Sequence, residues 1–210
     1  MRRSFAFAVA ACSLLFAATA HAGWPSPANS TIPGHVNLVG LGPAGPDSAF
    51  GHCEVIFRDL ANNPMPGVEI ALDFSDVSDM TIATDPHDPR LTVHCSPRMV
   101  TAVTDQNGRA VFTVIGSAIP GRPASPVYAF KLYADGILLG SPTLSAFDMN
   151  GQGGVDPTDL SLWSADFFSV TNPMRADYDG TGGVSIADLS LWSGAYFGAG
   201  SVQSAASYCP

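Results

Sequence analysis

The sequence predicts two domains of different class: an all-β sandwich over residues 23–146, and a small α-helical domain over residues 147–199. Short apolar runs separated by turn residues fill the first region, which is typical of a sandwich. A sixteen-residue segment occurs twice, in similar form, in the second region. The chain also has 21 Gly and 17 Pro but only 13% charged residues, a composition typical of a turn-rich β protein. Residues 200–210 are expected to form a C-terminal tail.

The first 22 residues have the pattern of a secretory signal. Arg2 and Arg3 precede an apolar run over residues 5–18, and residues 20–22 read Ala-His-Ala, an A-x-A cleavage site. The run is too short and too rich in alanine for a membrane span, and no later stretch is long enough. Cleavage after Ala22 leaves 210 − 22 = 188 residues. We therefore expect an exported protein, secreted or held at the cell surface, with no transmembrane segment. The arginine pair is also a fragment of a twin-arginine signal, which leaves the export route open.

Seven short runs predict an immunoglobulin-like sandwich, since about seven strands with frequent turns are typical of that fold. Their turn signals include Asp-Gln-Asn-Gly at residues 105–108 and Asp-Gly at residues 135–136. Residues 76–97, which contain the run Asp-Pro-His-Asp-Pro, predict a long loop. The predicted strands are residues 35–39, 53–58, 68–74, 100–104, 110–115, 128–133 and 137–144.

Two segments of this region resemble a known family. Residues 59–70 (DLANNPMPGVEI) and residues 104–112 (TDQNGRAVF) are similar to the bacterial immunoglobulin-like repeats of invasin and intimin. Those repeats have a turn ending in proline-glycine-valine and a later acidic turn at similar places. The resemblance implies a rigid extracellular spacer or adhesion module, with no catalytic residues to carry over.

Three cysteines remain once the signal is removed: Cys53, Cys95 and Cys209. Cys53 and Cys95 both lie beside strand-like runs of the same region, so we expect them to form a disulfide in an oxidising compartment. Cys209 is then left over. It is free, pairs between chains, or competes for one of the other two.

Residues 148–163 read DMNGQGGVDPTDLSLW, and residues 177–192 read DYDGTGGVSIADLSLW, 177 − 148 = 29 positions later. Calcium takes six to eight oxygen ligands, and twelve-residue loops supply them from positions 1, 3, 5, 7, 9 and 12 with glycine at position 6. Gly153 and Gly182 occupy that position. The repeat therefore predicts two calcium ions. The expected ligands are Asp148, Asn150, Gln152, the Gly154 carbonyl, Asp156 and Asp159 in the first copy, and Asp177, Asp179, Thr181, the Gly183 carbonyl, Ser185 and Asp188 in the second.

The pattern departs from an EF-hand, because position 12 is Asp rather than Glu and no helix signal precedes either loop. A calcium loop followed by a helix, twice, resembles the dockerin module over residues 147–198. The resemblance implies a cohesin-like protein partner or a cell-surface scaffold. Dockerins usually have Asp or Asn at position 5, whereas Gln152 and Thr181 carry no charge. We therefore expect weak calcium binding, with a Kd on the order of 10⁻⁴ to 10⁻³ M.

Partner contact in dockerins involves positions 10 and 11 of the loop, and the matching residues are Pro157, Thr158, Ile186 and Ala187. An alternative is that they only begin helices, which suffices for Pro157. Apolar residues at helical spacing follow, and Trp163 and Trp192 are expected to pack in a core rather than to stack on sugars. The two expected stripes are Leu160, Trp163 and Phe167, and Leu189, Trp192 and Tyr196.

The remaining function classes are constrained by what the sequence contains. The net charge of −9 argues against nucleic acid as a partner. No nucleophile elbow, zinc-protease motif or phosphate-binding loop occurs, so we expect no enzyme activity. Two alternatives stay open: the sandwich binds polysaccharide, or it is a divergent glycoside hydrolase with a pair of facing carboxylates. Candidates for that pair are Asp73, Asp76 and Asp79.

Overall fold

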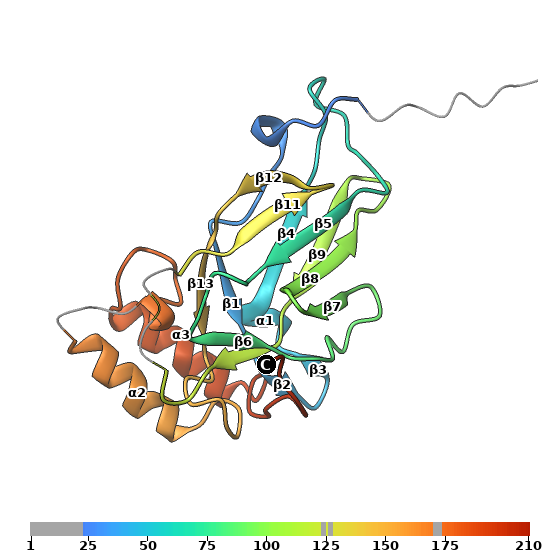
Figure 1. Cartoon of the computed structure of the whole chain (residues 1–210). Coiled ribbons are helices and arrows are strands. Elements are labelled where there is room, and N and C mark those ends of the chain that lie inside the picture. The colour runs from blue at the N-terminus through green and yellow to red at the C-terminus, as the bar shows by residue number, and fades with distance from the viewer. Residues whose placement is uncertain (1–22, 123–124, 126–127, 170–173) are drawn as a thin grey trace, which may run out of the picture.

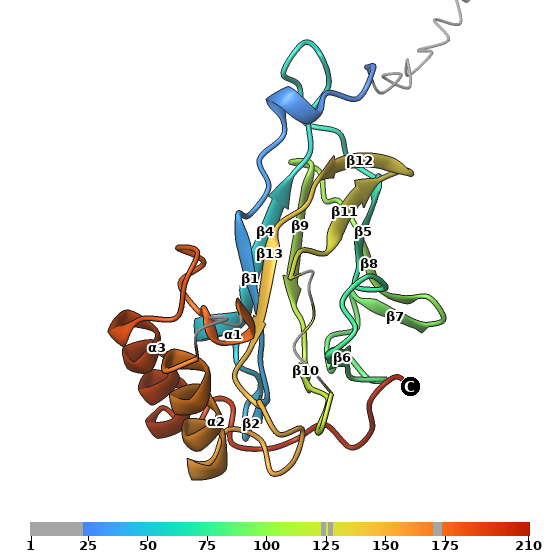
Figure 2. The ribbon, with the colours of Figure 1, turned by 60° about the vertical axis from the view of Figure 1, so that its left-hand side comes forward.

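The computed structural model describes residues 23–122, 125, 128–169 and 174–210. The expected signal segment, residues 1–22, lies outside the described residues. The described chain is mainly β, and its strands form two packed layers (Figure 1). The helices α2 (Pro157–Phe167) and α3 (Ile186–Phe197) lie together beside one end of these layers (Figure 2). The expected sandwich-like β architecture is therefore observed.

One layer is a five-stranded antiparallel sheet in the order β12-β11-β5-β8-β7. Its interior strands β5 and β8 point alternate apolar side chains inward, as the two-residue period of a strand requires. Ile70, Leu72 and Val100 are almost completely buried by this alternation. The strands are β12 (Ile137–Gly140), β11 (Lys131–Ala134), β5 (Glu69–Asp73), β8 (Arg98–Val103) and β7 (Thr92–Cys95).

The opposite layer contains two strand pairs (Figure 2). β1 (His35–Leu38) runs parallel to β13 (Thr143–Ala146), and β4 (His52–Ile56) is antiparallel to β9 (Arg109–Thr113). A third pair, β6 (Met80–Ile82) with β10 (Gly116–Ala118), is antiparallel. The shorter elements are η1 (Pro27–Asn29), β2 (Leu41–Gly42), β3 (Gly45–Pro46), α1 (Ser48–Gly51) and η2 (Met174–Ala176).

Two apolar clusters stabilise these elements. The larger one lies between the layers and is centred on aromatic side chains such as Phe74 and Phe130, whose ring centroids are 4.9 Å apart. The smaller one joins the helices to the strands. There, Trp163 and Trp192 pack with Phe147, which follows β13, and with Tyr178. Both indole rings are buried, which confirms the expected core role of the two tryptophans.

Two strand predictions need correction. The expected loop at residues 76–97 contains β6 and β7, whose three and four residues are too short to stand out beside the Asp-Pro-rich connection between them. The run at residues 137–144 is divided between β12 and β13, and Pro142 lies at the break. Proline has no N–H for a strand ladder, so it favours such a break.

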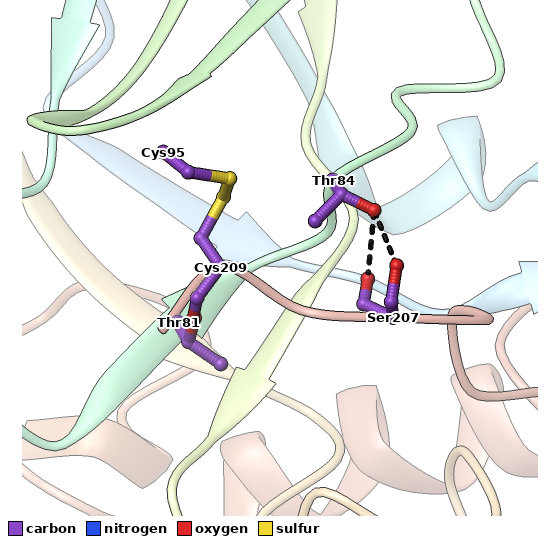
Figure 3. Close-up of a disulfide and its surroundings, with 5 residues drawn as sticks. All are labelled: Thr81, Thr84, Cys95, Ser207 and Cys209. Carbon is purple, nitrogen blue, oxygen red and sulfur yellow. Dashed lines mark hydrogen bonds between the residues drawn. A yellow bond between two sulfur atoms is a disulfide. The ribbon is translucent and has the colours of Figure 1, made fainter.

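The disulfide prediction is wrong. Cys95 is bonded to Cys209 (Figure 3), with Cα atoms 5.0 Å apart. Cys53 is free and buried. Alternation on β4 directs Cys53 into the main cluster, whereas Cys95 ends the edge strand β7. The backbone N–H of Cys209 donates to Ile82 O of β6 at 2.8 Å, which docks the tail beside that strand. Which cysteines pair is therefore determined by where the C-terminal tail docks, and not by the spacing of the cysteines in the sequence.

Among the described residues, no helix combines the length and the apolarity that a bilayer crossing needs.

Candidate metal centre

The first loop, residues 148–159, connects the end of β13 to the first turn of α2. Asp148 at position 1 comes two residues after the strand, and Asp159 at position 12 is the third residue of the helix. Both carboxyl groups are buried, at 1% and 0% exposure. The fold therefore brings two acidic side chains into one enclosed loop.

Asp159 organises the first loop through backbone hydrogen bonds. Its Oδ1 accepts from the N–H groups of Met149 and Asn150 at 2.8 and 3.0 Å, and its Oδ2 accepts from Asp156 N at 2.7 Å. The N–H of Gln152 donates to Asp148 Oδ1 at 3.1 Å and to Asn150 Oδ1 at 2.6 Å. Positions 1, 3 and 12 thus face the inside of the loop.

The second loop, residues 177–188, repeats this pattern position by position. Asp188 Oδ1 accepts from Asp179 N at 3.0 Å, and its Oδ2 accepts from Ser185 N at 2.7 Å. The N–H of Thr181 donates to Asp177 Oδ1 at 3.1 Å and to Asp179 Oδ1 at 3.0 Å. The repeated sequence therefore folds into similar geometry, in which four hydrogen bonds join the same loop positions in both copies.

The second loop gathers three carboxylates. One oxygen each of Asp177, Asp179 and Asp188 lies within 4.8 Å of the others. Asp177 and Asp188 are buried, and Asp179 is exposed. In the first loop position 3 is Asn150, so an amide oxygen takes the place of one carboxylate. At positions 1, 3 and 12, both loops therefore offer oxygen atoms as metal ligands, the kind of ligand that Ca²⁺ prefers.

The buried carboxyl groups are electrostatically unfavourable in their ionised form. Burial, with a smaller contribution from neighbouring carboxylates, raises the pKa of Asp148 to about 6 and that of Asp159 to about 7. Burial also raises the pKa of Asp177. Hydrogen bonding from Thr181 lowers the pKa of the exposed Asp179. A cation inside the loops would favour the ionised forms, so the donor set fits a divalent ion.

The other predicted ligands are placed less uniformly. The side chains of Gln152 and Thr181 at position 5 are exposed. At position 9, Asp156 and Ser185 cap α2 and α3 by accepting backbone N–H groups at 2.6 and 3.1 Å. Gly154 at position 7 is buried and Gly183 is half-buried. The position-9 residues Asp156 and Ser185 are thus both loop residues and the N-caps of the helices that follow.

The glycines predicted for position 6 have the backbone expected of them. Gly153 has φ of 79° and Gly182 has φ of 101°. These are left-handed values that side chains with a Cβ rarely adopt. The sharp turn of each loop therefore depends on glycine.

The predicted partner-contact residues Pro157, Thr158, Ile186 and Ala187 are all exposed at the starts of the two helices. Ile186 is 62% exposed. Sequence reasoning missed Phe168 and Phe197, which are each 79% exposed at the helix ends. Their separation, 197 − 168 = 29, equals that of the loops, and this was the signal that could have identified them.

The three alternative catalytic carboxylates make different local contacts. Asp76 forms an ion pair with Lys131 at 2.7 Å. Asp79 is fully buried and accepts a hydrogen bond from the Tyr128 hydroxyl at 3.3 Å. Asp73 accepts from the backbone of Ser75. Each carboxylate is thus engaged in a different local contact.

Sequence reasoning also missed the residues that hold the loops against the sandwich. The Asn37 side chain donates to Tyr178 O at 3.1 Å, and the ring of His35 lies against Gly180, where an added Cβ would be 2.7 Å from His35 Cγ. Ser204 contacts the first loop from the C-terminal tail. No motif marks these residues, because their roles depend on contacts distant in sequence.

No protein-family model, no curated protein and no solved structure matches this chain. The geometry of the two loops is therefore the basis for a proposed function.

Proposed function

We propose that this is an exported, non-catalytic protein in which a calcium-organised, dockerin-like module follows an immunoglobulin-like sandwich and docks onto a cohesin-like partner or a cell-surface scaffold. The observation that carries the proposal is the hydrogen-bond pattern that the two loops share. Each loop would hold one Ca²⁺. The residues that would hold the ions are Asp148, Asn150, Gln152, Gly154, Asp156 and Asp159, and Asp177, Asp179, Thr181, Gly183, Ser185 and Asp188.

Calcium would supply positive charge that offsets the repulsion between buried carboxylates. The protein's own residues supply the mechanical part. Asp159 and Asp188 belong to the first turns of α2 and α3, yet their oxygens accept N–H groups from the opposite side of the loop. A cation bound at positions 1, 3 and 12 would therefore fix each helix relative to its loop. Calcium binding then maintains the orientation of the helix surfaces.

The helices present surfaces suited to protein contact. The exposed residues of α2 are small or apolar and carry no charge: Pro157, Thr158, Ser161, Ala165 and, just beyond the helix, Phe168. On α3 the exposed residues are Ile186, Ala187, Ser190 and Phe197. Uncharged stripes that end in an exposed aromatic ring favour docking, since aromatic residues are enriched at interfaces.

Calcium binding is tested first by titration calorimetry of the mature chain. We expect two sites, and we expect Asp159→Asn or Asp188→Asn each to remove one of them. Asp135→Asn is the matched control, because Asp135 is an exposed turn residue with φ of 45°, a conformation that Asn tolerates. Titrations without heat or saturation for the wild-type chain would contradict the calcium assignment.

Docking is tested by surface binding to immobilised cohesin domains, with calcium and with chelator. We expect calcium-dependent binding that Ile186→Arg or Phe197→Arg weakens at least tenfold. Leu60→Arg is the control, because Leu60 is 66% exposed on the sandwich, away from the helices. Binding to cohesin domains that does not depend on calcium would contradict docking through the helices. So would a loss of binding in Leu60→Arg as large as that in Ile186→Arg or Phe197→Arg. Retention on polysaccharide instead would favour the alternative function of the sandwich.

A further inference from the structure

The last eleven residues, 200–210, form an extended segment that we call the C-terminal strap. It leaves the end of α3, passes the first loop and ends beside β6 (Figure 2). Gln203 pairs with Leu41 in both directions at 2.9 and 3.0 Å, and Ser201 Oγ donates to Asp47 Oδ2 at 2.8 Å. The strap is therefore docked along its path and does not trail from the helices.

The strap contacts the first loop directly. Val155 N donates to Ser201 O at 2.8 Å, and Gly154 N donates to Ser204 Oγ at 2.7 Å. The Ser204 hydroxyl in turn donates to Asp148 Oδ2 at 3.5 Å. Gly154 also has φ of 71°, and an added Cβ would lie 2.5 Å from the N atom of Gln203. The backbones approach so closely that only glycine fits.

The second loop provides an internal comparison for this contact. There, Asp177 Oδ2 accepts from Gly182 N at 2.9 Å, a group of its own loop. In the first loop, the corresponding oxygen of Asp148 accepts from Ser204 of the strap. Both position-1 carboxylates thus accept the position-5 N–H through Oδ1. They differ at Oδ2, which accepts from within the loop in Asp177 and from Ser204, 56 residues further along the chain, in Asp148.

The far end of the strap is held covalently. Cys209 is bonded to Cys95 on β7 (Figure 3). The hydroxyl of Thr81 donates to Cys209 O at 2.6 Å. Thr84 Oγ1 lies 2.5 Å from Ser207 Oγ (Figure 3). Ser204 thus lies between two anchors, the end of α3 and the disulfide.

We propose that the strap is a working part of the first loop: Ser204 is a positioning residue that holds the Asp148 carboxylate for the cation, and the Cys95–Cys209 disulfide keeps Ser204 in place. This inference rests on the proposed calcium function. It makes the two loops unequal, because calcium binding at the first depends on the strap and calcium binding at the second does not.

The experiment is calcium titration of the full mature chain in the Asp188→Asn background, which isolates the first loop. Ser204→Ala removes the acceptor of Gly154 N at 2.7 Å as well as the longer contact with Asp148 at 3.5 Å, so we expect several-fold weaker binding. Ser204→Thr keeps the hydroxyl and should restore affinity. Ala206→Ser, at an exposed position of the same strap, is the control and should leave affinity unchanged. Cys95→Ser with Cys209→Ser should weaken the first loop at least as much as Ser204→Ala.

The Asp159→Asn background isolates the second loop, where all these changes should leave affinity unchanged. Equal weakening of both loops would indicate general destabilisation and would overturn the inference, as would unchanged affinity of the first loop for Ser204→Ala. If the wild-type chain binds no calcium, the proposed function fails. Amide hydrogen exchange of Gly154 and Val155 then still tests the strap: their exchange should accelerate in the variant without the disulfide, and unchanged exchange would overturn the coupling.

Discussion

Removal of the Cys95–Cys209 disulfide should lower the free energy of unfolding by several kcal/mol. The two cysteines are 114 residues apart in sequence. In the chain-entropy model, closing a loop of this length removes about 16 cal/mol/K from the unfolded state, or about 4.8 kcal/mol at 25 °C. Cys95→Ser with Cys209→Ser should therefore shift the urea midpoint downward. With a slope of about 2 kcal/mol/M, the shift is about 2 M.

The assay is urea unfolding followed by tryptophan fluorescence, since Trp163 and Trp192 are buried and report on the smaller cluster. Cys53→Ala is the control. It removes one sulfur from the core and should cost about 1 kcal/mol, without the effect of opening a covalent loop. An unchanged midpoint for the double variant, or peptide mapping that finds Cys53 in a disulfide, would refute the reasoning.

Three further predictions follow from particular contacts. Arg175 and Asp166 form a largely buried ion pair at 2.7 Å, so Arg175→Ala should lower the free energy of unfolding by about 3 kcal/mol. Urea unfolding measures this change. A decrease of less than about 1 kcal/mol, as for a surface ion pair, would contradict the prediction. Burial raises the pKa of the Cys53 thiol to about 12, so iodoacetamide at pH 8 should label this thiol only as fast as the protein unfolds. Mass spectrometry measures the labelling rate. Rapid labelling in native buffer would show that the larger apolar cluster is open. The pKa values of Asp148 and Asp159 are raised from an unfolded value of about 3.9, so without calcium their stabilising contribution is complete below about pH 4 and is lost as pH rises through 6 to 7. In buffers depleted of calcium beforehand, the melting temperature should therefore be higher at pH 5 than at pH 8, and the reverse order would be inconsistent with the raised values.

The strands that could be predicted are those whose apolar residues alternate over five or more positions. The run at residues 110–115 identifies β9, and the run at residues 53–58 identifies β4, because period-two burial leaves a direct mark on sequence. The strands β6 and β7 leave no such mark. Their three or four residues are flanked by proline and aspartate. β6 is stabilised by pairing with β10, which is distant in sequence, and β7 by pairing with the neighbouring β8.

The loops were predictable for a different reason. Each loop is a local structure, in which positions 1 to 12 contact one another, so the residue types alone define the donor set. The supporting contacts are non-local. Ser204 meets Asp148 across 56 residues, and Cys95 meets Cys209 across 114. Such contacts depend on how the tail docks on the finished sandwich, which no spacing rule describes.

The most direct test of the calcium assignment is the melting temperature of the mature protein in 10 mM calcium and in EGTA, with magnesium at equal ionic strength as the control. For a Kd of about 10⁻⁴ M, calcium at this concentration stabilises each occupied loop by about 2.7 kcal/mol. We predict a melting transition several degrees higher in calcium than in magnesium, and full reversal by EGTA. Identical melting curves in calcium, magnesium and EGTA would contradict calcium binding by the two loops.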